Sequence, residues 1–129
     1  MSTAPHNGDI FALCDTIRET SFEIYKYLRS GHREKIYENA LVNRLRKRGI
    51  RLEQQQELRV FDEDGTLLGY LKADLLVEDR LICEIKGVHS LVNEHVAQLL
   101  GYLRASRIEH GLLINFGGPK LEIRKFIVN

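Results

Sequence analysis

The sequence has few cysteines, no long hydrophobic run and almost no net charge. Its two cysteines, Cys14 and Cys83, form neither a disulfide framework nor a zinc-binding spacing, and both fall among apolar residues, so we interpret them as core residues. No apolar stretch approaches the ~20 residues that span a bilayer. Residues 1–9 lack the basic and apolar regions of a secretory signal. We therefore expect a cytoplasmic protein with no membrane segment.

The composition is that of one folded domain. The chain has 129 residues, of which 43% are hydrophobic and 29% are charged, and a chain of this length forms one domain with its own core. It contains no internal repeats or long linkers, and its formal net charge of +1 neither requires nor excludes a nucleic-acid partner. We expect residues 1–129 to form a single domain. Because so small a domain offers little surface for recognition, we also expect a homodimer or a larger assembly.

Hydrophobic periodicity predicts three helices and five strands. Apolar residues recur at a spacing near 3.6 over residues 9–29, 33–48 and 90–106, as they do on the buried side of a helix. Strand patterns cover residues 50–61, 66–77, 81–86, 112–116 and 121–128. The order ααβββαββ predicts an α/β domain with a mixed central sheet flanked by helices. A run of three glutamines, Gln54–Gln56, is unusual for the middle of a strand.

The burial pattern predicts how the second and third strands pair. A register that sets Leu75 opposite Cys83 and Ala73 opposite Ile85 makes one face of this hairpin wholly apolar. A slip by one residue would mix polar and apolar side chains on both faces, because successive strand residues point to opposite sides. The third strand is flanked by apolar segments, so we expect it to lie at the centre of the sheet.

In that register the other face of the hairpin carries charged residues. Asp74 lies opposite Glu84, and Lys72 lies opposite Lys86. Two carboxylates ~5 Å apart repel by roughly 3 kcal/mol at an effective dielectric of about 20. Either the lysines neutralise the pair in a solvated network, or a divalent cation binds there. A central strand is a poor place for solvated charge, so we favour a cation with oxygen ligands, Mg²⁺ or Mn²⁺.

Asp74 and the triplet Glu84-Ile85-Lys86 resemble the D…(D/E)xK signature of the PD-(D/E)XK nuclease superfamily. The order of elements is also similar to the αβββαβ core of that superfamily. The proline that precedes the aspartate in the superfamily's name is Ala73 here, at a position that many members vary. The resemblance implies a restriction-endonuclease-like fold.

Further motifs resemble those of the GxxExxY protein family. Residues 31–37, GHREKIY, fit its G-x-x-E-x-x-Y pattern, and residues 95–103 resemble its H-x-x-Q-L-x-x-Y-L helix. Residues 112–117 and 127–129 are similar to its C-terminal end, so the resemblance extends over residues 15–129. It implies a Mg²⁺-dependent nuclease that hydrolyses phosphodiester bonds, with DNA as the expected partner. A non-catalytic module that binds nucleic acid or protein on a nuclease-like fold is the alternative.

The resemblance also implies a set of metal ligands. Asp74, Glu84 and the backbone carbonyl of Ile85 would bind the ion, and Glu34 would complete the site from the preceding helix. An acid is expected in the first turn of any helix, however, because it complements the helix dipole. Glu34 therefore has a structural interpretation as well as a functional one.

The remaining candidates are one lysine and two residues of the third helix. Lys86 would orient the attacking water or stabilise the transition state. Gln98 and Tyr102, a Q-x3-Y pair similar to that of helicase-linked exonucleases in the superfamily, would support the site. The same pair is equally consistent with the ordinary flank of an amphipathic helix.

A basic cluster at the end of the second predicted helix is a candidate for phosphate binding. It comprises Arg44, Arg46, Lys47 and Arg48. Basic residues in a last helical turn also complement the helix dipole whatever the function. The sequence therefore leaves this role open.

Overall fold

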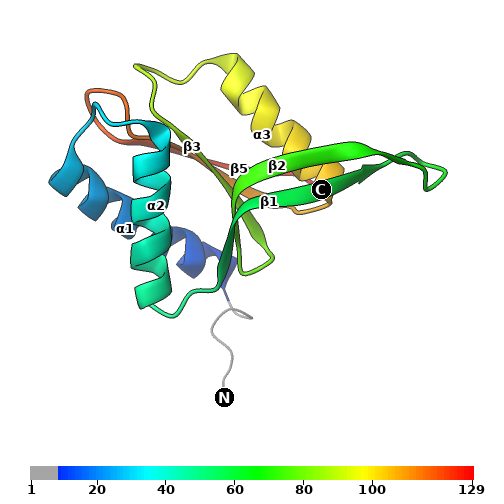
Figure 1. The fold of residues 1–129 in the computed structure, drawn as a ribbon, viewed down its shortest axis with the longest axis horizontal. Coiled ribbons are helices and arrows are strands. Elements are labelled where there is room, and N and C mark those ends of the chain that lie inside the picture. The colour runs from blue at the N-terminus through cyan, green and yellow to red at the C-terminus, as the bar shows by residue number, and fades with distance from the viewer. Residues whose placement is uncertain (1–8) are drawn as a thin grey trace.

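The helices and strands follow the predicted order ααβββαββ (Figure 1). The computed structural model describes residues 9–129. Residues 1–8 of the segment 1–9, in which the sequence shows no secretory signal, lie outside the described residues. The bounds of the elements are α1 Ile10–Leu28, α2 Glu34–Lys47, β1 Leu52–Phe61, β2 Leu67–Val77, β3 Leu81–Lys86, α3 Asn93–Ser106, β4 His110–Asn115 and β5 Glu122–Ile127. Within residues 9–129, no helix has both the length and the apolar character to cross a membrane.

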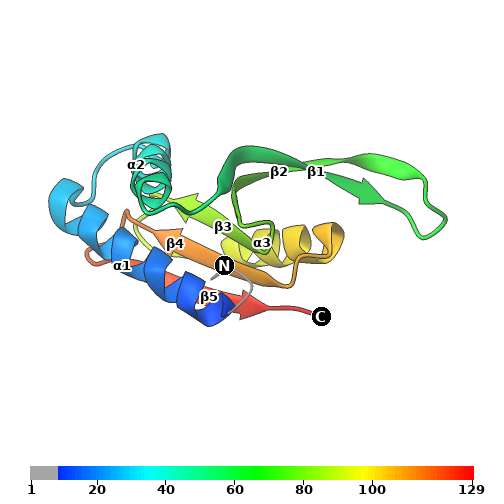
Figure 2. The same ribbon diagram turned by 90° about the horizontal axis from the view of Figure 1, so that it is seen from below.

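The five strands form one mixed sheet in the order β1-β2-β3-β4-β5, which confirms the predicted fold class. β3 and β4 run parallel, and the other neighbours run antiparallel. The parallel pair follows from α3, because a crossover helix returns the chain to the starting end of the sheet. β3 is the central strand, as predicted. The β1–β2 hairpin projects well beyond the other strands (Figure 2).

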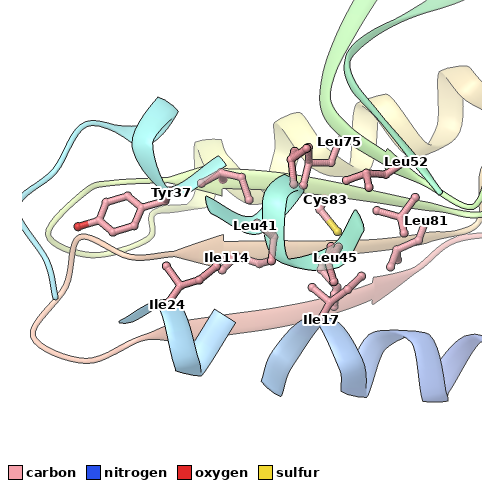
Figure 3. Packing of buried hydrophobic residues seen from close by; sticks show 14 of the residues in the cluster. Ile17, Ile24, Tyr37, Leu41, Leu45, Leu52, Leu75, Leu81, Cys83 and Ile114 are labelled. Atoms are coloured by element: carbon pink, nitrogen blue, oxygen red, sulfur yellow. The ribbon is translucent and has the colours of Figure 1, made fainter. Parts of the chain in front are cut away.

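Both faces of the sheet are covered, one by α1 and α2 and the other by α3. The larger cluster lies under α1 and α2 (Figure 3), and its buried members include Cys14, Ile17, Ile24, Leu41, Leu45 and Cys83. On the second face, Leu99 and Leu103 of α3 belong to a cluster with Leu76, Ile82 and Leu113. The sheet thus lies between two hydrophobic cores, so polar side chains buried in it must be satisfied by hydrogen bonds or ions.

β2 and β3 pair in the predicted register. Leu75 lies opposite Cys83, and the two following pairs toward the turn are in step with it. The ladder ends at the Leu75–Cys83 pair, however. Ala73 packs in the α3-side cluster and not opposite Ile85, which lies in the cluster under α1 and α2, so this part of the prediction is wrong.

A local break in the β1–β2 hairpin explains the difference. Gln55 has a φ of 55°, and neither Gln55 nor Asp74 joins the ladder, although their neighbours on both sides do. On one side of this point Leu52 and Leu75 pack under α1 and α2, and on the other side Leu58 and Ala73 pack against α3. The hairpin also stops pairing with β3 here. Lys72 lies opposite Glu57 of β1. Because the β2–β3 ladder ends at Leu75 and Cys83, the predicted pairing of Lys72 with Lys86 is wrong.

Gly117 marks a close approach between the chain ends of β3 and β4. A Cβ atom on Gly117 would lie 2.4 Å from the carbonyl carbon of Gly87 and 2.4 Å from the nitrogen of Val88. We expect Gly117→Ala to lower the free energy of unfolding by about 2–3 kcal/mol, because the backbone after β3 must shift.

The matched control is Gly101→Ala in α3, where an added Cβ meets nothing within 4 Å. This change should raise the free energy of unfolding by about 0.5–1 kcal/mol, because alanine favours a helix. Urea unfolding of both variants measures the two effects. Similar stabilities for both variants would contradict the close approach at Gly117.

Candidate active site

Asp74 and Glu84 lie at the fork, the point just beyond the Leu75–Cys83 pair where β2 leaves β3. Each carboxylate accepts a hydrogen bond from the backbone of the opposite strand. The Asp74 N–H donates to Glu84 Oε2 at 2.8 Å, and the Ile85 N–H donates to Asp74 Oδ2 at 2.8 Å. The two side chains thus take the place of the missing ladder bonds, and they hold the acids side by side.

At the fork Glu84 is buried and Asp74 is half-buried, and the two carboxylates are crowded. Glu84 is only 3% exposed. Burial raises the pKa of Glu84 to about 8, and the nearby charge of Asp74 adds to this effect. Burial also raises the pKa of Asp74, with a further contribution from Glu38. In the metal-free protein Glu84 therefore keeps its proton at neutral pH, and a cation at the fork would favour its ionised form.

The backbone carbonyl of Ile85 faces the fork as well. Lys86 O accepts a hydrogen bond from Phe116 N at 2.9 Å, so the peptide groups of Lys86 point to β4. The Ile85 N–H points to β2 and donates to Asp74. Both backbone polar groups of one strand residue point to the same side, so the Ile85 carbonyl points to β2 too.

The donors at the fork are therefore two carboxylates and one carbonyl. Hard oxygen ligands of this kind suit Mg²⁺, which is commonly held by one or two carboxylates and keeps several waters. Residues 9–129 contain no group of three or more His, Cys, Asp or Glu side chains placed to hold a metal. The residues fit Mg²⁺ or Mn²⁺ with a backbone ligand and water, and they do not fit a closed zinc site.

Hydrogen-bonded polar side chains connect the end of β3 with α3. Lys86 Nζ donates to Gln98 Oε1 at 3.0 Å, and Gln98 Nε2 donates to the Tyr102 hydroxyl at 3.4 Å. Burial raises the pKa of Tyr102, and the charges of Glu84 and Asp74 raise it further. The Q-x3-Y pair thus lies beside the acids at the fork, and Gln98 holds the lysine directly.

Glu34 has a different neighbour from the one that the resemblance implied. It is exposed, and its Oε2 accepts a hydrogen bond from the Gly87 N–H at 3.0 Å. The other motif residues also hold the chain in place: Gly31 has a φ of 110°, and the buried Tyr37 hydroxyl donates to Arg29 O at 2.5 Å. Within this segment Glu34 ties the start of α2 to the end of β3, and Tyr37 ties it to the end of α1.

Glu38, one turn further along α2, is the helix acid that approaches the fork. It is 4% exposed, and Gln55 Nε2 lies 3.0 Å from its Oε1 and 3.2 Å from Asp74 Oδ1. The role predicted for Glu34 stays a prediction, and these contacts make Glu38 a second candidate from α2. A signal for Glu38 was present in the sequence, because it lies three positions before Leu41 on the apolar side of the helix.

A protein-family model described as the PD-(D/E)XK nuclease superfamily matches residues 12–126. The chain belongs to the PD-(D/E)XK nuclease superfamily. The chain is also similar in fold to the crystal structure of SSO0001, with a TM-score of 0.59 and 21% sequence identity. That similarity covers 72% of this chain and 48% of SSO0001, so the chain spans about half the length of that protein. No curated protein matches the chain.

The basic cluster of this PD-(D/E)XK domain lies at the end of α2 away from Glu34. Arg44 approaches Glu23 of α1 at 3.9 Å, and Arg48 approaches Glu19 at 3.7 Å and Glu23 at 3.5 Å. Lys47 is exposed in the last turn. The acids of α1 partly neutralise the two arginines, and phosphate binding by this cluster stays a prediction.

Proposed function

We propose that this domain is a Mg²⁺- or Mn²⁺-dependent nuclease that hydrolyses phosphodiester bonds in nucleic acid, with DNA as its substrate. The observation that carries the proposal is the pair of acids at the fork, the buried Glu84 and the half-buried Asp74, with Lys86 two residues after Glu84 on the same strand. Membership of the superfamily supports it. The segments 31–37 and 95–103, which border the fork, support a place within the GxxExxY family.

In this proposal Asp74, Glu84 and the Ile85 carbonyl hold the ion, and Glu38 takes the supporting role that the resemblance gave to Glu34. A divalent ion at this point would lower the pKa of a bound water and neutralise charge on the scissile phosphate. The acids themselves do the binding and orienting. Because they are held by backbone N–H groups of the opposite strands, they need little rearrangement.

Lys86 supplies the positive charge of the site. Its ammonium group, held by Gln98 at 3.0 Å, would orient the attacking water or stabilise charge on the pentavalent phosphate. Gln98 and Tyr102 then act as positioning residues for the lysine. Nucleic acid is the proposed partner, and self-association is proposed on the small size of the domain alone.

A substrate panel tests the proposal. Plasmid, linear, branched and single-stranded DNA, together with RNA, are incubated with the protein and Mg²⁺ or Mn²⁺. We expect cleavage of at least one DNA substrate, and its complete loss when EDTA removes the metal. A protein that binds these nucleic acids but cuts none of them with either metal is a binding module, and the nuclease proposal is then wrong.

A further inference from the structure

The glutamine run in β1 contacts Glu38 with two consecutive side chains. Gln54 Nε2 donates to Glu38 Oε2 at 2.7 Å, and Gln55 Nε2 donates to Glu38 Oε1 at 3.0 Å and Oε2 at 3.1 Å. Consecutive residues of a regular strand point to opposite faces of the sheet. Two neighbours can reach the same carboxylate only if the strand is locally irregular.

The irregularity is the backbone of Gln55, whose φ of 55° lies in the left-handed region. Residues with a β-carbon seldom adopt this conformation, and those that do are concentrated at functional sites. Gln54 pairs with Leu75 and Gln56 pairs with Ala73 in an unbroken register. The left-handed backbone of Gln55 therefore leaves every β1–β2 pair intact except that of Gln55 with Asp74. Its local effect is to point the Gln55 amide toward Glu38 and Asp74.

The Gln55 amide bridges two elements of the site. Besides Glu38, its Nε2 contacts Asp74 Oδ1 at 3.2 Å, while the other oxygen of Asp74 accepts the Ile85 N–H. The Asp74 carboxylate is thus held at a fixed orientation by N–H donors, whereas Glu38 also accepts a hydrogen bond from Lys35 Nζ, 3.2 Å from its Oε2. The Gln55 amide orients Asp74 without adding a positive charge beside it.

We propose that Gln55 is a positioning residue that orients Asp74 for binding the divalent ion and fixes it relative to the supporting acid Glu38. This inference rests on the proposed metal site at the fork. It gives the glutamine run a function, and it explains why a strand residue that is neither glycine nor asparagine adopts a left-handed backbone. Gln55 acts through the two acids and does not itself bind the substrate.

Metal affinity tests the inference independently of cleavage. Mn²⁺ binding is measured by electron paramagnetic resonance, and Mg²⁺ by competition, on the parent and on Gln55→Gly and Gln55→Met. Glycine suits the left-handed backbone, and methionine keeps most of the side-chain volume, but neither has an amide donor. We expect both variants to lose about 10- to 100-fold in affinity, as is typical when an outer partner of a metal ligand is removed.

Two further variants separate positioning from a general effect on the strand. Gln56→Gly is the matched control, because the Gln56 amide donates to the Glu57 carbonyl at 3.4 Å and lies in regular strand; its affinity should equal that of the parent. In a Glu38→Gln background, Gln55→Gly should cause a smaller loss than in the parent, because part of its effect passes through Glu38. Urea unfolding shows that each variant is folded at the assay temperature.

The outcomes distinguish the inference from the proposed function. Equal Mn²⁺ affinity in the parent and in both Gln55 variants overturns the inference alone. Equal losses in Gln55→Gly and Gln56→Gly also overturn it, because the effect would then belong to the strand as a whole. If the parent binds neither Mn²⁺ nor Mg²⁺, the metal site of the proposed function is wrong, and the inference is overturned with it.

Discussion

Replacing Glu84 by glutamine should stabilise the metal-free protein, and the gain should increase with pH. Burial raises the pKa of Glu84 from 4.5 to about 8, with a further contribution from Asp74. In the folded protein this carboxyl keeps its proton over a pH range in which the unfolded chain has lost it. Because the folded state then binds more protons than the unfolded state, its stability falls as the pH rises from about 4.5 to about 8.

Glutamine removes this dependence and keeps most of the local structure. Its side-chain oxygen can still accept the Asp74 N–H, which lies 2.8 Å from Glu84 Oε2. One pKa unit corresponds to about 1.4 kcal/mol. We expect the variant to exceed the parent in free energy of unfolding by about 1 kcal/mol at pH 5 and by about 3–5 kcal/mol at pH 9.

Urea unfolding at pH 5, 7 and 9 in EDTA measures this difference. Glu53→Gln, which replaces an exposed glutamate of β1, is the control and should change the stability little at any pH. Addition of Mg²⁺ at pH 9 should stabilise the parent and leave Glu84→Gln almost unchanged. A difference between the variant and the parent that is independent of pH would show that Glu84 ionises without cost in the folded protein.

The sequence was sufficient to predict the fold because burial separates the two faces of each element. The apolar positions of α1, α2 and α3 recur at helical spacing, and one face of the β2–β3 hairpin is apolar only in the register that sets Leu75 opposite Cys83. The central position of β3 follows from the same reasoning. The prediction failed at Ala73, where the hairpin leaves β3, because nothing in the residue types there marks the end of the ladder.

The site was predicted in part for a similar reason. Asp74 and Glu84 come together because the register fixes them, and the Q-x3-Y pair follows from helical spacing. The left-handed backbone of Gln55 could not be predicted, because glutamine carries none of the local signals that mark this conformation in glycine or asparagine. The choice between Glu34 and Glu38 depends on how α2 is tilted against the sheet, which a motif does not specify.

Asp74→Asn and Lys86→Ala should both abolish hydrolysis and yet change the stability of the metal-free protein in opposite directions. In the proposed site, asparagine would remove a negatively charged metal ligand, and alanine would remove the positive group proposed to face the phosphate. We expect each change to reduce the cleavage rate by about 10³-fold, as is typical for the loss of a group that stabilises transition-state charge. Oligonucleotide binding at low salt should persist in both variants, because phosphate contacts from other parts of the surface supply most of the affinity.

The opposite effects on stability follow from the charges at the fork. Burial raises the pKa of Asp74, with a contribution from Glu38, so the ionised carboxylate is unfavourable there, and asparagine removes it while keeping an oxygen for the Ile85 N–H. Without metal at pH 8, Asp74→Asn should therefore be as stable as the parent or more stable. Lys86 lowers the pKa of both Asp74 and Glu84, and its removal should lower the free energy of unfolding by up to about 1 kcal/mol.

Cleavage assays and urea unfolding of the same preparations test both parts. Lys26→Ala on the exposed side of α1 is the matched control for the lysine, and it should keep the activity and the stability of the parent. An ordinary structural ion pair predicts a different pattern, because neutralising Asp74 would then remove a favourable contact with Lys86. If Asp74→Asn lowers the stability as much as Lys86→Ala does, and the parent cuts no substrate, Asp74 and Lys86 are such a pair and the nuclease assignment must be abandoned.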